Sequence, residues 1–316
     1  GEGITGNFEN DPLKLSDESL MVVGGCHSLI FGQNGKIIGD SLEAASFSSF
    51  GFGKAGEKIK LRNISLSIKK IFHFSAELRR MSTIAQVQNS NLTGQNKNRY
   101  YVLTKGAPDV ISQYLVTIPD GYSETYRNYT RQGCRVLALA YRPLEANEIN
   151  DNDPAFNHLD RVKAEKDLMF AGFVIFASPM KKGTEDTIAM LLQSTHRVIM
   201  ITGDDPLTAC HVALRLHIIS SQKECIIHDE NVTDVNGNVI TTDTTNTQQY
   251  VHCYTGKGLK KLTKKEFESV VKTCNVYARM SPHDKEEIMH KLRALDQKTL
   301  MCGDGTNDVG ALKQAN

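Results

Sequence analysis

The pattern of apolar and polar positions changes about halfway along the chain. Between residues 58 and 104, short apolar runs with partial period-two alternation are separated by turn-forming segments such as 89–98. Runs of this kind are typical of an antiparallel sheet. The neighbouring sequence predicts helices at 18–29, 41–46, 108–115 and 122–132. The first part of the chain is therefore expected to be an α+β domain.

Beyond residue 169, apolar runs alternate with stretches of helical spacing. The runs predict strands at 170–176, 197–201, 276–279 and 299–302. The stretches between them predict helices at 183–194, 206–216, 282–295 and 308–315. This alternation is typical of an α/β domain, in which helices cover both faces of a mostly parallel sheet.

The change of pattern predicts two domains, at 1–176 and 177–316. A length of 316 residues agrees with two domains of ordinary size. Within the second domain, the polar segment 220–262 interrupts the alternation and becomes rich in Thr and Asn toward 241–249. We expect this segment to be an exposed insert.

Composition narrows the class of protein. The 37 basic and 36 acidic residues leave a formal charge of +1, which argues against a dedicated nucleic-acid binder. The seven Cys are scattered and form no C-x-x-C pair, so neither a disulfide framework nor a zinc site is expected. The longest mainly apolar stretch, 168–177, is too short to cross a bilayer. These features predict a cytosolic chain that does not itself span a membrane.

Two polar clusters follow predicted strands of the second domain, where a doubly wound sheet binds its ligands. Thr202-Gly203-Asp204 is the first, and residues 303–308 form the second. Glycine lets a backbone approach a phosphate closely, and the helix that follows offers unpaired N–H groups. Taken singly, each cluster also agrees with a simple tight turn.

The second cluster carries the acidic and amide side chains Asp304, Asn307 and Asp308. Carboxylates in a phosphate site repel the phosphate unless a hard cation lies between them. Mg²⁺ suits this role because it binds through few carboxylates and retains several waters. The sequence therefore predicts a magnesium site at 304–308.

Four segments resemble signatures of the P-type ATPases and occur in that family's order: KGAP at 105–108, CRVLALAYR at 134–142, TGDDPLTA at 202–209 and GDGTNDVGALKQA at 303–315. Together they extend from residue 105 to residue 315. FSAELRRMS at 74–82 and GFVIFASPMKK at 172–182 are similar to the type V subfamily, in its endoplasmic-reticulum branch. The resemblance implies a nucleotide-binding domain followed by an incomplete phosphorylation domain of haloacid-dehalogenase-like fold.

The resemblance also implies a nucleotide site in the first domain. Lys105 and Gly106 of KGAP would line the adenine pocket, and Arg135 would reach the phosphates of ATP. Phe72 or Phe74 would stack on adenine. Without the motifs around them, these residues have plainer interpretations: Lys105 as a solvated lysine, Arg135 as a surface arginine, and the phenylalanines as core aromatics.

In the second domain, the resemblance implies that Thr202 and Gly203 hold the transferring phosphoryl group. Asp204 would contact the nucleotide or the hinge, and Lys285 would neutralise phosphate charge. Asp304 would coordinate Mg²⁺, with the side chains at 307 and 308 organising that site. Without the motif around it, Lys285 is an ordinary solvated helix lysine.

The phosphorylated aspartate of this family lies in a D-K-T-G-T sequence, and no Asp of this chain has that context. We therefore expect the nucleophile, the actuator domain and the transmembrane helices to lie outside this chain. The expected activity is binding of ATP and Mg²⁺ without full turnover, on the cytosolic face of an endoplasmic-reticulum membrane protein.

Two alternatives remain open from the sequence. A stand-alone phosphatase of the haloacid-dehalogenase fold would need a D-x-D nucleophile after its first apolar strand, and none is present. A non-catalytic nucleotide-binding module would retain the cluster at 303–308 only as a structural feature.

Overall fold

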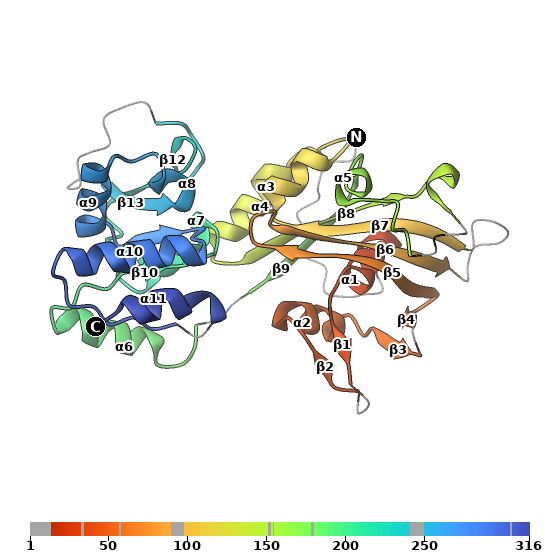
Figure 1. The fold of residues 1–316 in the computed structure, drawn as a ribbon, viewed down its shortest axis with the longest axis horizontal. Coiled ribbons are helices and arrows are strands. Elements are labelled where there is room, and N and C mark those ends of the chain that lie inside the picture. The colour runs from red at the N-terminus through yellow and green to blue at the C-terminus, as the bar shows by residue number, and fades with distance from the viewer. Residues whose placement is uncertain are drawn as a thin grey trace. The chain divides into compact units, whose positions relative to one another are not determined.

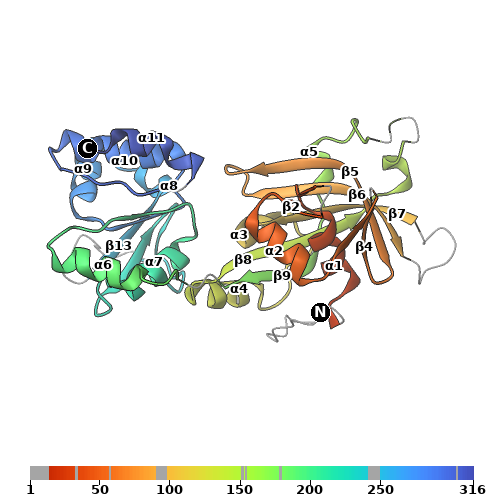
Figure 2. The same cartoon turned by 90° about the horizontal axis from the view of Figure 1, so that it is seen from below.

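The computed structural model describes residues 14–32, 35–56, 58–89, 98–150, 153, 155–177, 180–240, 250–303 and 305–316. The chain divides into two compact units, each of which is drawn in Figures 1 and 2. Unit 1 comprises Gly1–Tyr126 and Val136–Phe176, and unit 2 comprises Arg127–Arg135 and Ala177–Asn316. Each unit is described by itself below.

Unit 1 is built on a seven-stranded sheet in which the strand order follows the chain. The strands are β3 (Gly53–Ala55), β4 (Lys58–Leu61), β5 (Ile64–Ser75), β6 (Arg80–Asn89), β7 (Asn98–Gly106), β8 (Arg135–Pro143) and β9 (Met169–Phe176). Neighbouring strands from β3 to β8 pair antiparallel. This arrangement confirms the antiparallel sheet predicted for 58–104.

The run at 170–176 forms strand β9, which lies at the edge of the sheet of unit 1. It falls in the first of the two predicted domains, but its grouping with the alternating strands and helices of the second half is wrong. Its apolar side chains contact both cores of that unit: Ala171 and Val174 pack on one core, and Phe170 and Phe173 pack on the other. A strand that is covered on both faces is apolar along its whole length. Its sequence pattern therefore does not show whether it belongs to this antiparallel sheet or to the parallel sheet of unit 2.

Helices cover both faces of the sheet of unit 1 (Figures 1 and 2). One face carries α1 (Asp17–Gly25), α2 (Ser41–Ser49) and the hairpin of β1 (Ile30–Phe31) and β2 (Ile37–Ile38). The other carries α3 (Pro108–Ile111), α4 (Tyr122–Arg131) and α5 (Arg161–Ala164). The helices predicted in this half of the chain are thus confirmed, although α1 ends four residues earlier than expected.

A buried polar network joins α5 to the sheet on the second of these faces. The carboxylate of Glu165, which is 1% exposed, accepts hydrogen bonds from Arg80 Nε at 2.6 Å and Ser82 Oγ at 2.6 Å. The guanidinium of Arg80 also lies 4.4 Å from the ring centroid of Tyr114. A buried carboxylate is tolerated only when a cation and hydrogen-bond donors compensate it, so these contacts depend on one another.

Unit 2 contains a five-stranded sheet with the order β10-β14-β13-β11-β12. Its strands are β10 (Met200–Ile201), β11 (Glu224–His228), β12 (Val232–Asp234), β13 (Tyr250–Thr255) and β14 (Val276–Ala278). All neighbours pair parallel except β11 and β12, which are antiparallel. The prediction of a sheet with parallel strands is therefore confirmed.

Helices cover both faces of this second sheet as well. Helices α6 (Thr184–Gln193) and α7 (Pro206–Arg215) pack on one face. The other face carries α9 (Lys264–Thr273), α10 (Pro282–Ala294) and α11 (Val309–Gln314), and the short helix α8 (Gly256–Leu259) follows β13. Within the described part of the chain, no helix combines the length and apolarity needed to cross a membrane.

The expectation of an exposed insert at 220–262 is wrong. The segment supplies β11 and β13, which lie inside the sheet, and Ile226 and Cys253 are fully buried. A short apolar run is sufficient for a strand that is buried on both faces. In this segment the surrounding polar residues dominate the composition, so the composition predicted an exposed insert. The Thr- and Asn-rich stretch at 241–249 lies outside the described residues.

The strand predicted at 299–302 is also absent from the described residues. Leu300 is 90% exposed, whereas Met301 is partly buried and packs against the core beneath α9 to α11. The backbone of Thr299 instead bonds to the end of the chain: its N–H donates to Asn316 Oδ1 at 3.0 Å, and its carbonyl accepts from Asn316 N at 3.2 Å.

Glu165→Gln is expected to lower the free energy of unfolding by about 3 kcal/mol, because it leaves the Arg80 guanidinium buried without a counter-charge. The matched control is Glu185→Gln. Glu185 pairs with Arg215 at 2.9 Å, but both side chains are more than half exposed, so the cost should stay below about 1 kcal/mol. Urea unfolding followed by circular dichroism compares the two, and equal costs would contradict the role given to Glu165.

Candidate functional site

Lys105 lies in β7 on the face that α1 and α2 cover. Its Nζ is 2.8 Å from Glu43 Oε1, and the two side chains are 14% and 10% exposed. The second carboxylate oxygen of Glu43 accepts hydrogen bonds from the backbone N and the Oγ of Ser28. Glu43 was missed at the sequence level, where its spacing from Asp40 signals only the start of a helix. The pair fixes the position of the Lys105 ammonium.

Gly106 has a steric reason to be glycine. A Cβ at this position would lie 2.7 Å from the carbonyl oxygen of Arg79 and 2.7 Å from the Cβ of Arg80. Real Cβ atoms do not approach backbone so closely, and the neighbouring strand would have to move. Gly106 therefore keeps β6 and β7 in register beside Lys105.

Phe72 lies on the opposite face of the sheet from Lys105. It pairs with Ser82, whose hydroxyl belongs to the network around Glu165, and its ring packs on the core beneath α3 to α5. The ammonium of Lys70 lies 5.1 Å from the centroid of this ring. Phe72 is thus placed as a core residue of that face.

Phe74 is placed differently because β5 contains a bulge. The pairing with β6 is irregular between Phe72 and Ser75, and Ser75 pairs with Arg80. Strand alternation from Ser75 then puts Phe74 on the face of Met81, which itself pairs with Lys105. Phe74 is 62% exposed. The bulge therefore brings one of the two predicted aromatics, and not the other, to the face of Lys105.

His27 lies beside the Lys105–Glu43 pair and was also missed. Its ring is 3% exposed and packs edge-on against Phe31 and Phe47, with centroid distances of 5.9 and 5.5 Å. Burial lowers the pKa of His27 to about 4. The imidazole is therefore neutral at physiological pH.

In unit 2, Thr202, Gly203 and Asp204 follow β10 directly at the carboxyl end of the parallel strands. The N–H of Thr202 donates to Tyr277 O at 2.9 Å, and Arg279 N donates to Asp204 O at 2.9 Å. These bonds attach the loop to β14 and to the residues that follow it. The structure therefore gives the predicted phosphoryl loop a fixed backbone.

Arg279 is a further residue of this region that sequence reasoning missed. Its φ of 49° is left-handed, which is uncommon for a side chain with a Cβ and is often retained at functional sites. The guanidinium lies 2.6 Å from Asp205 Oδ2 and 3.5 Å from Asp229 Oδ2. Asp229 in turn accepts from Thr255 Oγ1 at 2.7 Å. Arg279, which follows β14, thus links the loops that follow β10 and β11, and Asp229 is bonded in turn to the last residue of β13.

Arg135 falls within the 127–135 segment of unit 2. Its Nη1 is 4.0 Å from Asp204 Oδ1, and the side chains are 54% and 48% exposed. A pair at this distance in contact with solvent contributes little energy, so both groups remain available to other partners.

Lys285 and Asp308, which were predicted separately for phosphate charge and for the magnesium site, lie together in the structure. Lys285 Nζ donates to Asp308 Oδ1 at 2.7 Å, and the side chains are 13% and 12% exposed. This hydrogen bond lowers the pKa of Asp308, which therefore stays ionised. Lys285 of α10 is thus held by Asp308, the last residue of the 303–308 cluster.

The remaining residues of the predicted magnesium site are placed only in part. Asn307 is exposed, and Asp304 lies outside the described residues. Gly303 permits the turn, since a Cβ there would lie 2.7 Å from the Cβ of Asp308. Of the described side chains, Asn307 and Asp308 are those of this cluster that offer oxygen ligands suited to Mg²⁺.

A second set of metal-capable groups lies on α10, where His283, Asp284 and Glu287 have ligand atoms within 4.8 Å of one another. Asp284 is already engaged, because it accepts from the backbone and hydroxyl of Ser281 at the start of the helix. The arrangement is that of a helix cap.

Comparison with known proteins identifies the class to which this arrangement belongs. Residues 26–183 match the family model for the P-type ATPase, cytoplasmic domain N. The match covers half of the chain, and the chain belongs to the P-type ATPase family.

Curated relatives match over almost the whole chain. The probable manganese-transporting ATPase PDR2 of Arabidopsis thaliana is 36% identical over 98% of this chain and 26% of its own length. The endoplasmic reticulum transmembrane helix translocase spfA of Aspergillus fumigatus is 37% identical over 95% of this chain and 25% of its own length. The endoplasmic reticulum transmembrane helix translocase of Saccharomyces cerevisiae is 34% identical over 99% of this chain and 27% of its own length. The chain thus spans about a quarter of the length of these relatives.

The stability of the chain is expected to fall with acidification through the titration of His27. The folded state keeps its imidazole neutral down to about pH 4, whereas the unfolded state binds a proton near the ordinary value of 6.5. Between these values the unfolded state holds more protons, so the free energy of unfolding decreases as pH falls.

His27→Gln should therefore show a shallower loss of stability than the wild type between pH 7 and pH 4.5, measured by urea unfolding at several pH values. The exposed residue His283 supplies the control, and His283→Gln should keep the wild-type slope. A wild-type slope in His27→Gln would exclude His27 as the titrating group.

Proposed function

We propose that this chain is the ATP-binding cytosolic region of a membrane P-type ATPase of type V. The full-length protein would couple ATP hydrolysis, through an aspartyl phosphate, to translocation across or out of a membrane. The names of the relatives place such proteins in the endoplasmic reticulum and describe a transmembrane helix translocase. The cytosolic face of that membrane is the location that we assign.

The nucleotide site is proposed for the α1/α2 face of unit 1. The observation that carries it is the Lys105 ammonium, fixed by Glu43 on the face to which the bulge in β5 brings Phe74. An exposed aromatic ring can stack on a purine, and the aliphatic stem of a lysine packs along its edge. Of the two predicted aromatics, this geometry supports Phe74.

The phosphoryl-transfer groups are proposed for unit 2. Thr202 and Gly203 would hold the transferring group, and Lys285 would offset its charge. Asp304, with the side chains at 307 and 308, would hold Mg²⁺, which would supply further compensation of phosphate charge. Arg135 would reach the phosphates of ATP, and Asp204 would contact the nucleotide or the hinge. The fixed backbone of the 202–204 loop and the Lys285–Asp308 pair support this assignment.

The reaction proposed for the full-length protein moves the γ-phosphoryl group of ATP to an aspartate carboxylate and releases ADP. Water then cleaves the acyl phosphate and restores the carboxylate. Because no Asp of these 316 residues lies in a D-K-T-G-T sequence, we assign the nucleophile to another part of the polypeptide. The chain by itself would bind nucleotide without turnover.

Lys105→Gln is expected to weaken ATP binding at least tenfold, on the scale of about 1.5–3 kcal/mol for a hydrogen bond to a charged group. Isothermal titration calorimetry measures this loss against Lys60→Gln, an exposed lysine of β4. Because Lys105→Gln leaves Glu43 without its cation, the double variant with Glu43→Gln is measured as well. Unchanged affinity in a variant that retains the wild-type melting temperature would remove Lys105 from the site.

Asp304→Asn is expected to leave adenosine binding unchanged and to reduce the dependence of ATP binding on Mg²⁺. Calorimetric titrations with and without Mg²⁺ provide the comparison, and equal dependence in both proteins would exclude Asp304 as a ligand. A phosphate-release assay in the same samples tests the proposed class. Release that persists through purification, and that an alanine scan assigns to a carboxylate of this chain, would favour the stand-alone phosphatase.

A further inference from the structure

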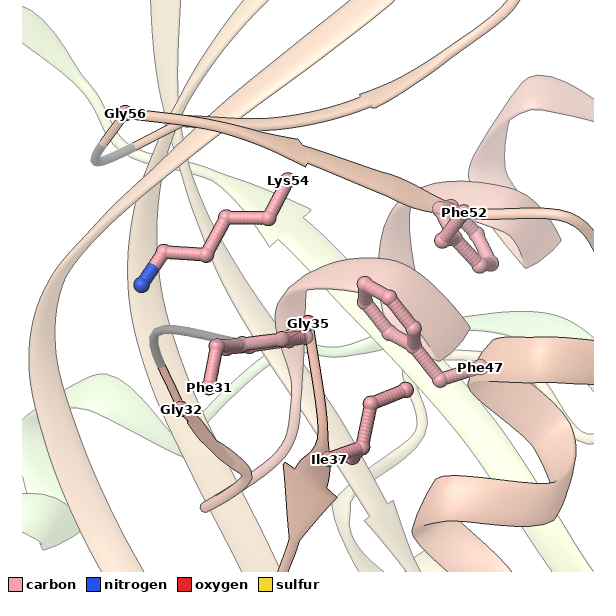
Figure 3. Close-up of a pocket in the computed structure, with 8 residues that line it drawn as sticks. All are labelled: Phe31, Gly32, Gly35, Ile37, Phe47, Phe52, Lys54 and Gly56. Atoms are coloured by element: carbon pink, nitrogen blue, oxygen red, sulfur yellow. The ribbon is translucent and has the colours of Figure 1, made fainter.

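The pocket drawn in Figure 3 lies beside the β1–β2 hairpin of unit 1, and packed side chains occupy its walls. Phe47 and Phe52 are 2% and 9% exposed and belong to the core beneath α1 and α2. The ammonium of Lys54 already lies over the ring of Phe31, 4.9 Å from its centroid. These side chains therefore serve the packing of unit 1. A different group of side chains, to which no role has been given so far, lies in unit 2.

Three cysteines meet in the core of unit 2, where α7 packs on the sheet. Cys210 comes from α7, Cys225 from β11 and Cys253 from β13. They are free thiols of one apolar cluster and are 2%, 5% and 0% exposed, respectively. In the register of the two parallel strands, Ile227 lies opposite Cys253, so Cys225 and Cys253 share one face of the sheet. Cys210 therefore approaches two sulfurs of the sheet from the helix that covers them.

The sulfurs of Cys210 and Cys225 are 2.9 Å apart. A disulfide bond is about 2.05 Å long, so closing the bond requires the two sulfurs to approach by less than about 1 Å. The two residues are 15 positions apart in the sequence. The bond would join the middle of α7 to the beginning of β11 and close the chain between them into a loop.

Cys274 shows that burial alone does not produce such a contact. It is 5% exposed, as is Cys225, but its thiol donates to the backbone carbonyl oxygens of His252 and Val276, each at 3.2 Å. The contact between Cys210 and Cys225 is therefore a specific feature of the way in which α7 packs on β11.

The surroundings of the pair determine how it would react. The hydrogen bond with Cys210 and burial in the core both raise the pKa of the Cys225 thiol. Because the thiolate is the reactive form, oxidation is expected to be slow. A disulfide is easily reduced when its thiolates are stabilised, and this core does not stabilise them. A disulfide at this position is therefore expected to form slowly and to persist.

We propose that Cys210 and Cys225 are a site of covalent modification, at which a peroxide converts the two thiols into a disulfide that ties α7 to β11. One sulfur attacks hydrogen peroxide, so that the O–O bond breaks, a sulfenic acid forms and one water leaves. The other sulfur then displaces the hydroxyl group from the sulfenic sulfur, which forms the S–S bond and releases a second water. Two thiols and one peroxide thus give one disulfide and two waters, and a dithiol reductant restores the thiols.

The bond would restrain two elements that lead to the same edge of the sheet. Helix α7 begins directly after Asp205, and β11 ends directly before Asp229. The guanidinium of Arg279 pairs with both carboxylates. A cross-link limits how far the segments that it joins can separate, so the disulfide would oppose the opening of α7 away from β11. The inference concerns the core of unit 2 and does not depend on the proposed function.

The test treats the whole wild-type chain with millimolar hydrogen peroxide under native conditions. Free thiols are then alkylated, and peptide mapping by mass spectrometry locates the disulfides. A cross-link between Cys210 and Cys225 is expected, and dithiothreitol should remove it. The exposed thiol of Cys302 is the internal measure of oxidation.

Amide hydrogen exchange measures the restraint on the two elements. After oxidation, exchange in α7 and β11 should slow at least about tenfold, because the cross-link suppresses the openings that separate them. Exchange in β5 and β6 of unit 1 should not change. These strands therefore serve as the reference within the same sample.

Cys210→Ala should lose both the cross-link and the slower exchange that peroxide induces in α7. Cys274→Ala is the matched control, because it removes an equally buried thiol that bonds to backbone carbonyls, and it should retain both effects. Alanine is suitable in both variants, since a buried cysteine packs as a small apolar residue.

Four results would overturn the inference. The first is the absence of a Cys210–Cys225 cross-link once Cys302 is fully oxidised. The second is a cross-link of Cys210 to Cys253 in its place, and the third is sulfinic acid at Cys210 or Cys225 without a disulfide. The fourth is a cross-link that leaves the exchange of α7 unchanged. All four are measured on the wild-type chain, so they apply even if Cys210→Ala does not fold.

Discussion

The central strands of the sheet of unit 1 are covered on both faces, and this constraint decides where its charged groups can lie. Val102 and Leu103 are neighbours in β7, yet they belong to separate cores on opposite sides of the sheet. A polar side chain in such a strand is largely removed from water and needs a partner. Lys105 finds Glu43 on one face, and Arg80 finds Glu165 on the other. The two pairs therefore compensate buried charge on opposite faces of the same sheet, with side chains that are at most 10% exposed in one pair and at most 14% exposed in the other.

In unit 2 the corresponding constraint comes from parallel strands, whose carboxyl ends meet at one edge of the sheet. This edge collects carboxylates that would repel one another without cations between them. Arg279 compensates Asp205 and Asp229, and Lys285 compensates Asp308. These ion pairs hold the loops at this edge of the sheet in place.

Sequence reasoning was most successful where a local signal coincided with the tertiary environment. The helix at α10 has Pro282 in its first turn and a Ser281 cap, and its predicted range agrees with the structure to within one residue. Sequence reasoning failed where the tertiary environment, and not a local pattern, decided whether a run of residues forms a strand. The runs at 224–228 and 250–255 are too short and too surrounded by polar residues to stand out, yet both are strands inside the sheet. The apolar run at 299–302 stands out in the sequence and yet is not a strand: Leu300 is 90% exposed, and Met301 is only partly buried.

The sequence by itself determined the family, the two kinds of domain and the motifs, since these depend on residue identity and spacing along the chain. The tertiary structure decided which residues share a face. Phe72 and Phe74 are equivalent in an alternating strand, and only the bulge before Ser75 separates them. Glu43, His27 and Arg279 acquire their roles from partners distant in sequence. The physical reason is that electrostatic pairing and burial act through space, and strand register and helix docking set which side chains meet.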